Sequence, residues 1–269
     1  MKNRNLLKNL AGLLFAVAML IAAFVVVSPE AVKATTVIPE FSFKNSGKST
    51  VTITDDQCTY VTGELAYIKI KPKADGYLTI KFSNASSLSS YASGKVQLYN
   101  GNKAKILSPI DNYNTNYTDS YYYTECYGLK KNTQYYVAVM SYEGVKISAD
   151  FKKVNDKSGA KKAKAKTINK KKVTTGTVIA GTKSSDWYKI KLTSKQKLRV
   201  NFTPYLTDDV NVTLSGPGVN TRTFTLSPSM WWGRKDQIYT TGKVRTGTYY
   251  VKVQPSTKSC SGYYKISWK

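Results

Sequence analysis

The residue types that carry most enzyme chemistry are missing from this chain. Its 269 residues include 41 Lys and Arg but no histidine, and no CxxC sequence occurs. Without histidine there is no Ser-His or Cys-His pair, and the commonest general base is absent. The carboxylates of Asp208 and Asp209 remain, but adjacent side chains on an extended chain point apart. We therefore expect no enzyme activity, no zinc or other metal site and no cofactor.

A sharper indication of function is the aromatic and basic segment over residues 230–235. Aromatic rings beside cations suit stacking on sugar rings or gripping an acidic glycan. We predict ligand contacts from Trp231, Trp232, Arg234 and Lys235. A structural alternative stays open, because on a strand one of the two tryptophans would face the core and the other would be incidental.

The first half of the chain has a tyrosine-rich segment over residues 111–127, at the place that corresponds to the tryptophan pair. We predict that Tyr113, Tyr117 and Tyr122 also contact ligand. The alternative is a loop that folds over the edge of a sandwich.

The first 34 residues have the organisation of an export signal. Residues 10–27 are uncharged and apolar, Pro29 breaks the run, and residues 32–34 offer the small side chains that a signal peptidase needs. The positive region before the run contains Lys2, Arg4 and Lys8. An uncleaved membrane anchor is the alternative, since about 18 apolar residues approach the length that spans a bilayer. We expect a secreted or cell-surface protein with no transmembrane segment after cleavage.

Positive charge is concentrated in the second half of the chain. Residues 35–152 carry 13 Lys and 10 acidic residues, whereas residues 153–269 carry 24 Lys or Arg and 5 Asp, a net charge of +19. Such asymmetry favours an anionic partner, here an acidic polysaccharide, a cell-wall polymer or anionic lipid head groups. Export makes nucleic acid a poor candidate, and solubility with weak non-specific adhesion is the plain alternative.

The three cysteines are unevenly divided, with Cys58 and Cys126 in the first half and Cys260 in the second. An exported chain can keep disulfides. We predict a disulfide between Cys58 and Cys126, which would contribute about 4 kcal/mol in the chain-entropy model. Cys260 would then be a free thiol or form an intermolecular bridge.

The elements that must position these residues are short alternating strands. In residues 186–192, Tyr188, Ile190 and Leu192 point one way, and Lys189 and Lys191 point the other way. The same pattern occurs 120 positions earlier, in residues 68–71. Alternation also predicts that three large aromatic residues face the core: Tyr135, Tyr249 and Trp268.

Three further matches, in the same order, indicate an internal duplication. The first pairs Ile70, Leu78, Ile80 and Phe82 with Ile190, Leu198, Val200 and Phe202; the others pair residues 134–139 with 248–253 and residues 146–148 with 265–267. Each half has about seven or eight short strands and no convincing helix. We therefore predict an all-β protein: two antiparallel, jelly-roll-like β-sandwich domains in tandem behind a signal peptide.

The expected boundaries are a signal peptide over 1–34, a first domain over 35–153, a Lys-rich linker or beginning of the second domain over 154–173, and a second domain over 174–269. Residues 157–172 contain eight lysines and show no apolar face. A solvated helix is the alternative for that segment, since Ala and Lys are good helix formers.

The second half resembles the bacterial pre-peptidase C-terminal domain, a jelly-roll-like β-sandwich of secreted enzymes. The residues that carry the likeness are 186–190, Leu198, Val200, 212–214, 247–253 and 262–264. It covers roughly residues 174–269, and the first half is similar to a degenerate copy.

The resemblance implies a domain that accompanies a catalytic domain and binds substrate or surfaces. Some members of the family bind calcium through acidic residues before the Trp. Here Lys183, Ser184 and Ser185 precede Asp186, so the acidic cluster is missing and no calcium site is expected.

Together these features predict a secreted, non-catalytic protein that binds cell-wall or extracellular acidic polysaccharide. The alternative is a structural or adhesive surface protein that engages other extracellular proteins. A third reading is a hydrolase accessory or inhibitor acting in trans.

Overall fold

The computed structural model describes residues 36–41, 43, 46–53, 66–84, 94–102, 110–111, 123–141, 144–156, 158–227 and 235–269. Within these ranges the regular structure consists of β-strands and one short 3₁₀-helix, η2 (Lys162–Lys164). No helix of the described residues is long and apolar enough to cross a membrane.

The first half folds into two facing sheets. One sheet has the order β1-β3-β8-β5-β6 and the other the order β2-β9-β4-β7. The strands are β1 (Thr36–Phe41), β2 (Gly47–Ile53), β3 (Ala66–Ile70), β4 (Gly76–Asn84), β5 (Gly94–Asn100), β6 (Ile110–Asp111), β7 (Tyr123–Leu129), β8 (Tyr135–Ser141) and β9 (Val145–Lys153).

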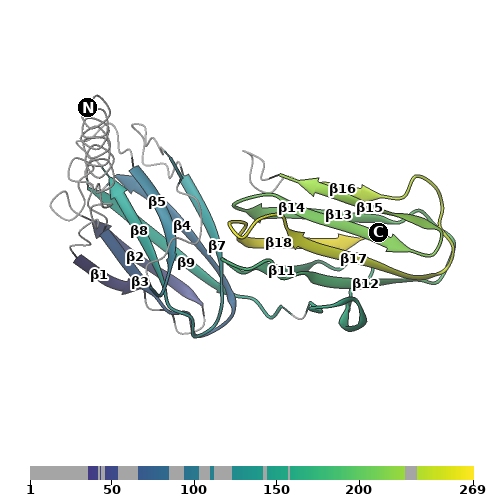
Figure 1. Ribbon diagram of the computed structural model, residues 1–269, viewed down its shortest axis with the longest axis horizontal. Coiled ribbons are helices and arrows are strands. Elements are labelled where there is room, and N and C mark those ends of the chain that lie inside the picture. Colours follow the sequence, from purple (N-terminus) through teal and green to yellow (C-terminus); the bar gives the residue numbers. More distant parts are fainter. Residues whose placement is uncertain are drawn as a thin grey trace, which may run out of the picture.

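The second half repeats this arrangement strand for strand. Its sheets have the orders β10-β12-β17-β14-β15 and β11-β18-β13-β16. The strands are β10 (Lys166–Thr167), β11 (Thr174–Val178), β12 (Asp186–Leu192), β13 (Arg199–Leu206), β14 (Val210–Gly216), β15 (Val219–Leu226), β16 (Asp236–Tyr239), β17 (Gly247–Pro255) and β18 (Gly262–Trp268). The two sandwiches follow one another along the long axis of the molecule (Figure 1).

Strand register supports the duplication as strongly as strand order does. Ile70 lies opposite Tyr135 in β8, and its counterpart Ile190 lies opposite Tyr249 in β17. Likewise Phe82 lies opposite Ile147, and Phe202 opposite Ile266. All three matches found in the sequence therefore involve strands with the same position in each sandwich.

Each sandwich contains one parallel strand pair, which the antiparallel prediction did not include. β1 runs parallel to β3, and β10 runs parallel to β12. In both halves the chain crosses to the opposite sheet, through β2 or β11, before it returns to pair with its first strand. A crossover of this kind permits parallel pairing, and alternation of side chains carries no information about strand direction.

The two sandwiches have separate hydrophobic cores. The first core contains residues from Phe41 to Phe151, together with Ala180, and the second contains residues from Ile168 to Trp268. The predicted core aromatics Tyr135, Tyr249 and Trp268 are all buried.

The lysine-rich segment lies against the second sandwich where the structure describes it. Gly159 and Trp187 exchange two backbone hydrogen bonds, of 2.8 and 3.2 Å, before β10 pairs with β12. Helix is limited to the three residues of η2. Ile168 is buried in the second core and Ala165 is also buried, and these two apolar residues are too few to produce a periodic pattern.

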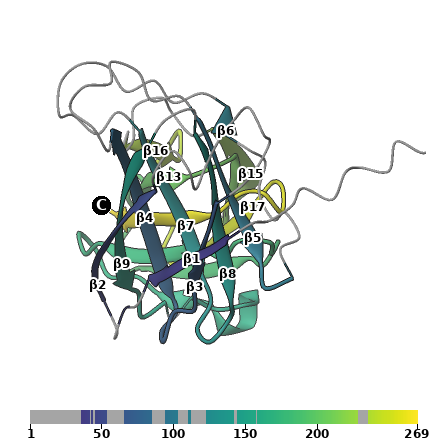
Figure 2. The same ribbon diagram turned by 90° about the vertical axis from the view of Figure 1, so that its left-hand side faces the viewer.

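The sandwiches meet where the end of the second, near β11 and β18, packs against β7 of the first (Figure 1). Figure 2 looks along the long axis, with the first sandwich in front of the second. The N–H of Gly128 in β7 donates to the Ser261 hydroxyl at 2.9 Å, and its carbonyl accepts from the N–H of Ala180 at 2.9 Å. The ring of Tyr263 lies between those of Tyr77 and Tyr205, with centroid distances of 3.8 and 4.4 Å. We refer to this contact as the junction.

Two glycines allow this close approach. Across the junction, a Cβ on Gly128 would lie 2.0 Å from the carbonyl oxygen of Val178, and a Cβ on Gly262 would lie 3.2 Å from that of Cys126. Gly262 also has a φ of +130°, which L side chains rarely adopt. The junction is therefore a specific fit of backbone to backbone.

Candidate functional site

The second sandwich has a groove where its two sheets open at one edge, between β15 and the end of β16. The groove has a volume of about 270 Å³ and is lined by Leu214, Gly218, Val219, Asn220, Arg222, Phe224, Tyr239, Thr240, Thr241, Gly242, Lys243 and Val244. Ligand pockets typically have volumes of about 300–1,000 Å³, so this one suits a single ring-sized group.

Strand pairing explains why β15 presents an arginine and a phenylalanine to the groove. Arg222 lies opposite Leu214, and Phe224 lies opposite Val212. Leu214 and Val212 are buried between the sheets, and residues opposite each other in an antiparallel pair share a face. Because β15 is the edge strand, Arg222 on this inner face remains exposed to solvent, while Phe224 packs against the core.

The facing wall comes from β16 and the turn after it. Ile238 is buried, so the next residue, Tyr239, points outward and is 57% exposed. The Thr240 hydroxyl accepts from the Leu198 N–H at 3.1 Å and donates to the Gly242 carbonyl at 2.8 Å. These bonds fix the turn that carries the exposed side chain of Lys243.

The groove is positively charged, and no acidic residue in its lining neutralises its two cations. Arg222 and Lys243 line it, and none of its lining residues is acidic. Elsewhere in the second half, carboxylates accept hydrogen bonds from hydroxyl groups, as Asp208 does from Thr257 and Ser259. The groove can therefore hold an anion.

The segments predicted to contact ligand lie mostly outside the described residues. This applies to Trp231, Trp232 and Arg234 and to Tyr113, Tyr117 and Tyr122, whose roles stay predictions. Lys235 is described and exposed, but it lies at the opposite end of β16 from Tyr239 and does not line the groove. The described strands do show that both segments join equivalent strands, β6 to β7 and β15 to β16.

The cysteines give one clear result. Cys58 lies outside the described residues, so its disulfide with Cys126, which is buried in β7, remains a prediction. Cys260 is a buried free thiol that donates to the carbonyl of Asp208 at 3.3 Å. Burial raises its pKa to about 12, so the thiolate needed for a bridge to another molecule does not form readily.

Two aspartates meet at the beginning of the second sandwich through Ser158. Asp156 accepts from the N–H groups of Ser158 and Thr177 at 2.9 and 2.7 Å, and the Ser158 hydroxyl donates to Asp186 at 2.6 Å. The Tyr264 hydroxyl also donates to Asp186 at 2.6 Å. Burial, followed by repulsion from Asp156, raises the pKa of Asp186 to about 6.

The Asp156–Asp186 cluster is satisfied by protein donors. The described residues contain no group of three or more His, Cys, Asp or Glu that could hold a metal ion. The cluster fastens the connection between the sandwiches to β11, β12 and β18, which is a structural role.

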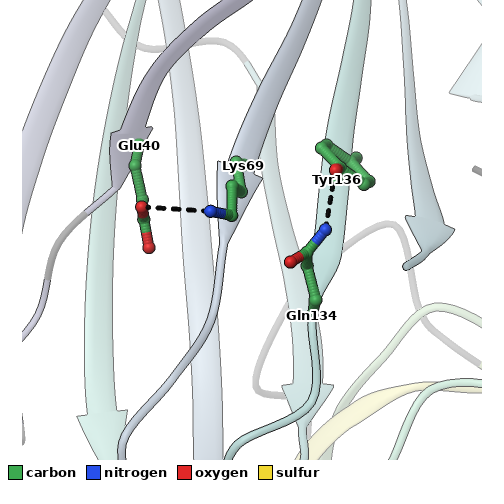
Figure 3. Close-up of polar contacts among 4 residues, drawn as sticks. All are labelled: Glu40, Lys69, Gln134 and Tyr136. Atoms are coloured by element: carbon green, nitrogen blue, oxygen red, sulfur yellow. Dashed lines mark hydrogen bonds and ion pairs between the residues drawn. The ribbon is translucent and has the colours of Figure 1, made fainter. Parts of the chain in front are cut away.

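The outer face of β1, β3 and β8 carries a second polar and aromatic cluster (Figure 3). Lys69 lies 3.6 Å from the Glu40 carboxylate, and the Gln134 amide donates to the Tyr136 hydroxyl at 2.6 Å. Tyr67 makes edge contacts with Tyr136 and Tyr99, but it is only 5% exposed. Its ring is not available as a stacking surface, so this face fits a ligand less well than the groove does.

The groove residues were missed by the sequence analysis, although one signal was present. Residues 219–226 alternate, and Arg222 has the same parity as Phe224 and Leu226. A cation in the inward register of a strand indicates an unusual edge. The contribution of Tyr239 depends on the strand pairing across the sandwich, which the local sequence does not reveal.

Comparisons with known proteins give only distant matches, all of them to solved structures. No family model matches the sequence, and no curated protein matches it. Among solved structures, the chain is similar to a pre-peptidase C-terminal domain of collagenase from Bacillus anthracis, at 17% identity and a TM-score of 0.30, covering 39% of this chain and 93% of that one.

Two other similar structures have low identity as well. One is a CBM22-1-CBM22-2 tandem domain of Xyn10C from Paenibacillus barcinonensis, at 9% identity and a TM-score of 0.24, covering 76% of this chain and 82% of that one. Another is a putative secreted protein from Eubacterium rectale, at 10% identity and a TM-score of 0.26, covering 81% and 72%. TM-scores this low assign no function to the chain.

Proposed function

We propose that this protein is an exported, non-catalytic binding protein for acidic polysaccharide, and that the groove between β15 and β16 is its binding site. The observation that carries the proposal is the exposed ring of Tyr239 in a groove that also contains Arg222 and Lys243 and no acidic residue. Export rests on residues 1–34, which lie outside the described part of the chain.

Each wall of the groove supplies one part of sugar recognition. The face of Tyr239 can stack on the apolar face of a sugar ring, with Phe224 forming the apolar floor. The guanidinium of Arg222 can bind a carboxylate or sulfate with two parallel hydrogen bonds, which a point charge such as Lys243 cannot do. Asn220 and Thr241 remain for sugar hydroxyl groups.

The test is a binding array of neutral, carboxylated and sulfated polysaccharides, run at low salt and at about 1 M salt, where the Debye length falls to about 3 Å. We expect acidic polymers to bind at low salt. The variants Tyr239→Ala and Arg222→Gln should each weaken binding about tenfold, a loss of about 1.4 kcal/mol.

A matched control is the pair Lys191→Gln and Lys195→Gln, which removes two exposed cations of the same sandwich outside the groove. If the control lost as much binding affinity as the groove variants, net charge alone would explain the binding, and this would contradict the proposal. The double variant Trp231→Ala and Trp232→Ala tests the predicted contribution of that segment. Binding of extracellular proteins but no polysaccharide would favour the adhesive alternative, through pairing at the open edge of β15.

A further inference from the structure

A second pocket lies at the junction, with walls from both sandwiches. Its volume is about 420 Å³, and it is lined by Tyr77, Lys152, Lys153, Val154, Asn155, Lys166, Val173, Thr174 and Thr175. Lys152 and Lys153 come from the end of β9, whereas Lys166 belongs to β10 of the second sandwich. None of the lining residues is acidic.

The chain segments that bring these lysines together are fixed at several points. The Val154 N–H donates to the Asp75 carbonyl at 3.0 Å, and the Lys153 N–H donates to the Ser46 hydroxyl at 3.0 Å. Two residues later, Asp156 is bound to β11 through Thr177. Lys166 is held by pairing with Tyr188 in β12. The pocket is therefore formed before any ligand arrives.

Tyr77 ties the pocket to the rigid part of the junction, because its ring stacks on Tyr263 at 3.8 Å. The hydroxyl-bearing residues Thr174 and Thr175 lie in β11, which pairs with β18 along its whole length. Three lysines thus line a pocket whose other walls also offer hydrogen-bond donors.

The positive charge of the pocket is compensated in part. Lys152 lies 3.9 Å from the Asp150 carboxylate, at the limit of an ion pair, and its side chain is mostly exposed. Holding three ammonium groups around one pocket costs Coulomb energy, which a bound anion would recover. A carboxylate brings a single charge on two oxygens. Free phosphate brings up to two charges and several acceptor oxygens, whereas the phosphodiester of a polymer brings one charge on a tetrahedral group.

We propose that the junction pocket binds a phosphate group through Lys152, Lys153 and Lys166, with donors from both sandwiches. Free phosphate and the phosphates of a polymer share this chemistry. The site is separate from the groove and does not depend on the function proposed for it. Because the ligand contacts both halves, binding should stabilise the junction itself.

The test measures thermal unfolding and calorimetric binding of the protein with inorganic phosphate, with a poly(glycerol phosphate) chain, and with a carboxylated polysaccharide. We expect both phosphate ligands to raise the unfolding temperature. The triple variant Lys152→Gln, Lys153→Gln, Lys166→Gln should weaken phosphate binding at least about tenfold, because charge-assisted hydrogen bonds are lost. Free phosphate and polymer are distinguished by which of them binds more tightly.

The control is the triple variant Lys130→Gln, Lys146→Gln, Lys191→Gln, which removes as many exposed cations from the same sandwiches but none from the pocket. It should bind phosphate like the unaltered protein. The proposal is overturned if phosphate does not stabilise the unaltered protein, or if the two triple variants lose affinity equally. Neither result would affect polysaccharide binding at the groove.

Discussion

The edge strands β7 and β16 occupy the same place in their sandwiches but have opposite surroundings. In β7, Cys126 lies opposite Thr79 and is buried; in β16, the corresponding Tyr239 lies opposite Arg199 and is exposed. The first edge is covered by the second sandwich, whereas the second edge is open and forms one wall of the groove.

The difference shows how one duplicated unit acquires two roles. An uncovered edge strand is a ready surface for association. In the first copy, Gly128 has no side chain, so the backbone of the second sandwich can approach β7 closely. This edge strand therefore forms the contact between the two sandwiches. In the second copy, the same edge presents Tyr239 and is followed by Lys243, and Arg222 of β15 lines the groove from the other sheet. This arrangement suits a small charged ligand better than a backbone.

The largest expected effect comes from closing the approach at β7. Gly128→Ala places a Cβ 2.0 Å from the Val178 carbonyl oxygen, so the junction must separate. We expect a loss of about 3 kcal/mol in the free energy of unfolding, typical of severe overpacking. Denaturant unfolding measures the loss, and small-angle scattering should show a longer, more flexible particle.

Gly242→Ala is the matched control on the open edge, since no atom lies within 4 Å of a Cβ there. It should leave stability nearly unchanged. An equal loss in both variants would mean that the junction contributes nothing specific at Gly128.

The second expected effect is a pH dependence from Asp186, which fastens the connection between the two sandwiches. Burial raises its pKa from 3.8 to about 6, so the folded state binds this proton more tightly than the unfolded chain does. Stability from this group is therefore fully present below about pH 4 and is lost as pH rises through about 6. A shift of about two units corresponds to about 3 kcal/mol as an upper bound.

Unfolding free energies of the unaltered protein and of Asp186→Asn, measured from pH 4 to pH 8, test this sign. As pH rises, the unaltered protein should lose stability relative to Asp186→Asn, because only the unaltered protein must hold a buried charge. Asp208 supplies the opposite case: burial opposes its charged form, but hydrogen bonds from Thr257, Ser259 and a backbone N–H together lower its pKa. Parallel curves for the unaltered protein and Asp186→Asn would contradict the prediction.

The smallest effect concerns the aromatic stack. Tyr77→Leu removes a ring that lies 3.8 Å from Tyr263, and an aromatic pair contributes about 1 kcal/mol beyond its buried area. Tyr239→Leu removes an exposed ring from the other edge and should not change the unfolding temperature. If both substitutions were equally harmless, the stack would be incidental to the junction.

The sequence predicted those features that depend on local alternation. Strands such as β12 and β17 have a buried face with a period of two, so their existence, their inward residues and the duplication could be inferred. Parallel pairing of β1 and β10 could not, because direction is set by crossovers. The role of Gly128 could not be predicted either, because it depends on a contact with Ser261, 133 residues away. The groove could not be predicted because it forms where β15 and β16, from different sheets, come together.

One substitution between the copies has a consequence for self-assembly. Counting along the two edges from Cys126 and Tyr239, Thr241 stands where the first copy has Gly128. Its side chain would collide with an incoming main chain just where Gly128 leaves room. We therefore expect no head-to-tail stacking of whole molecules, which repeated heterologous contacts of this kind would otherwise extend into filaments. The protein should therefore not form filaments at high concentration, although its two sandwiches are themselves joined by a head-to-tail contact.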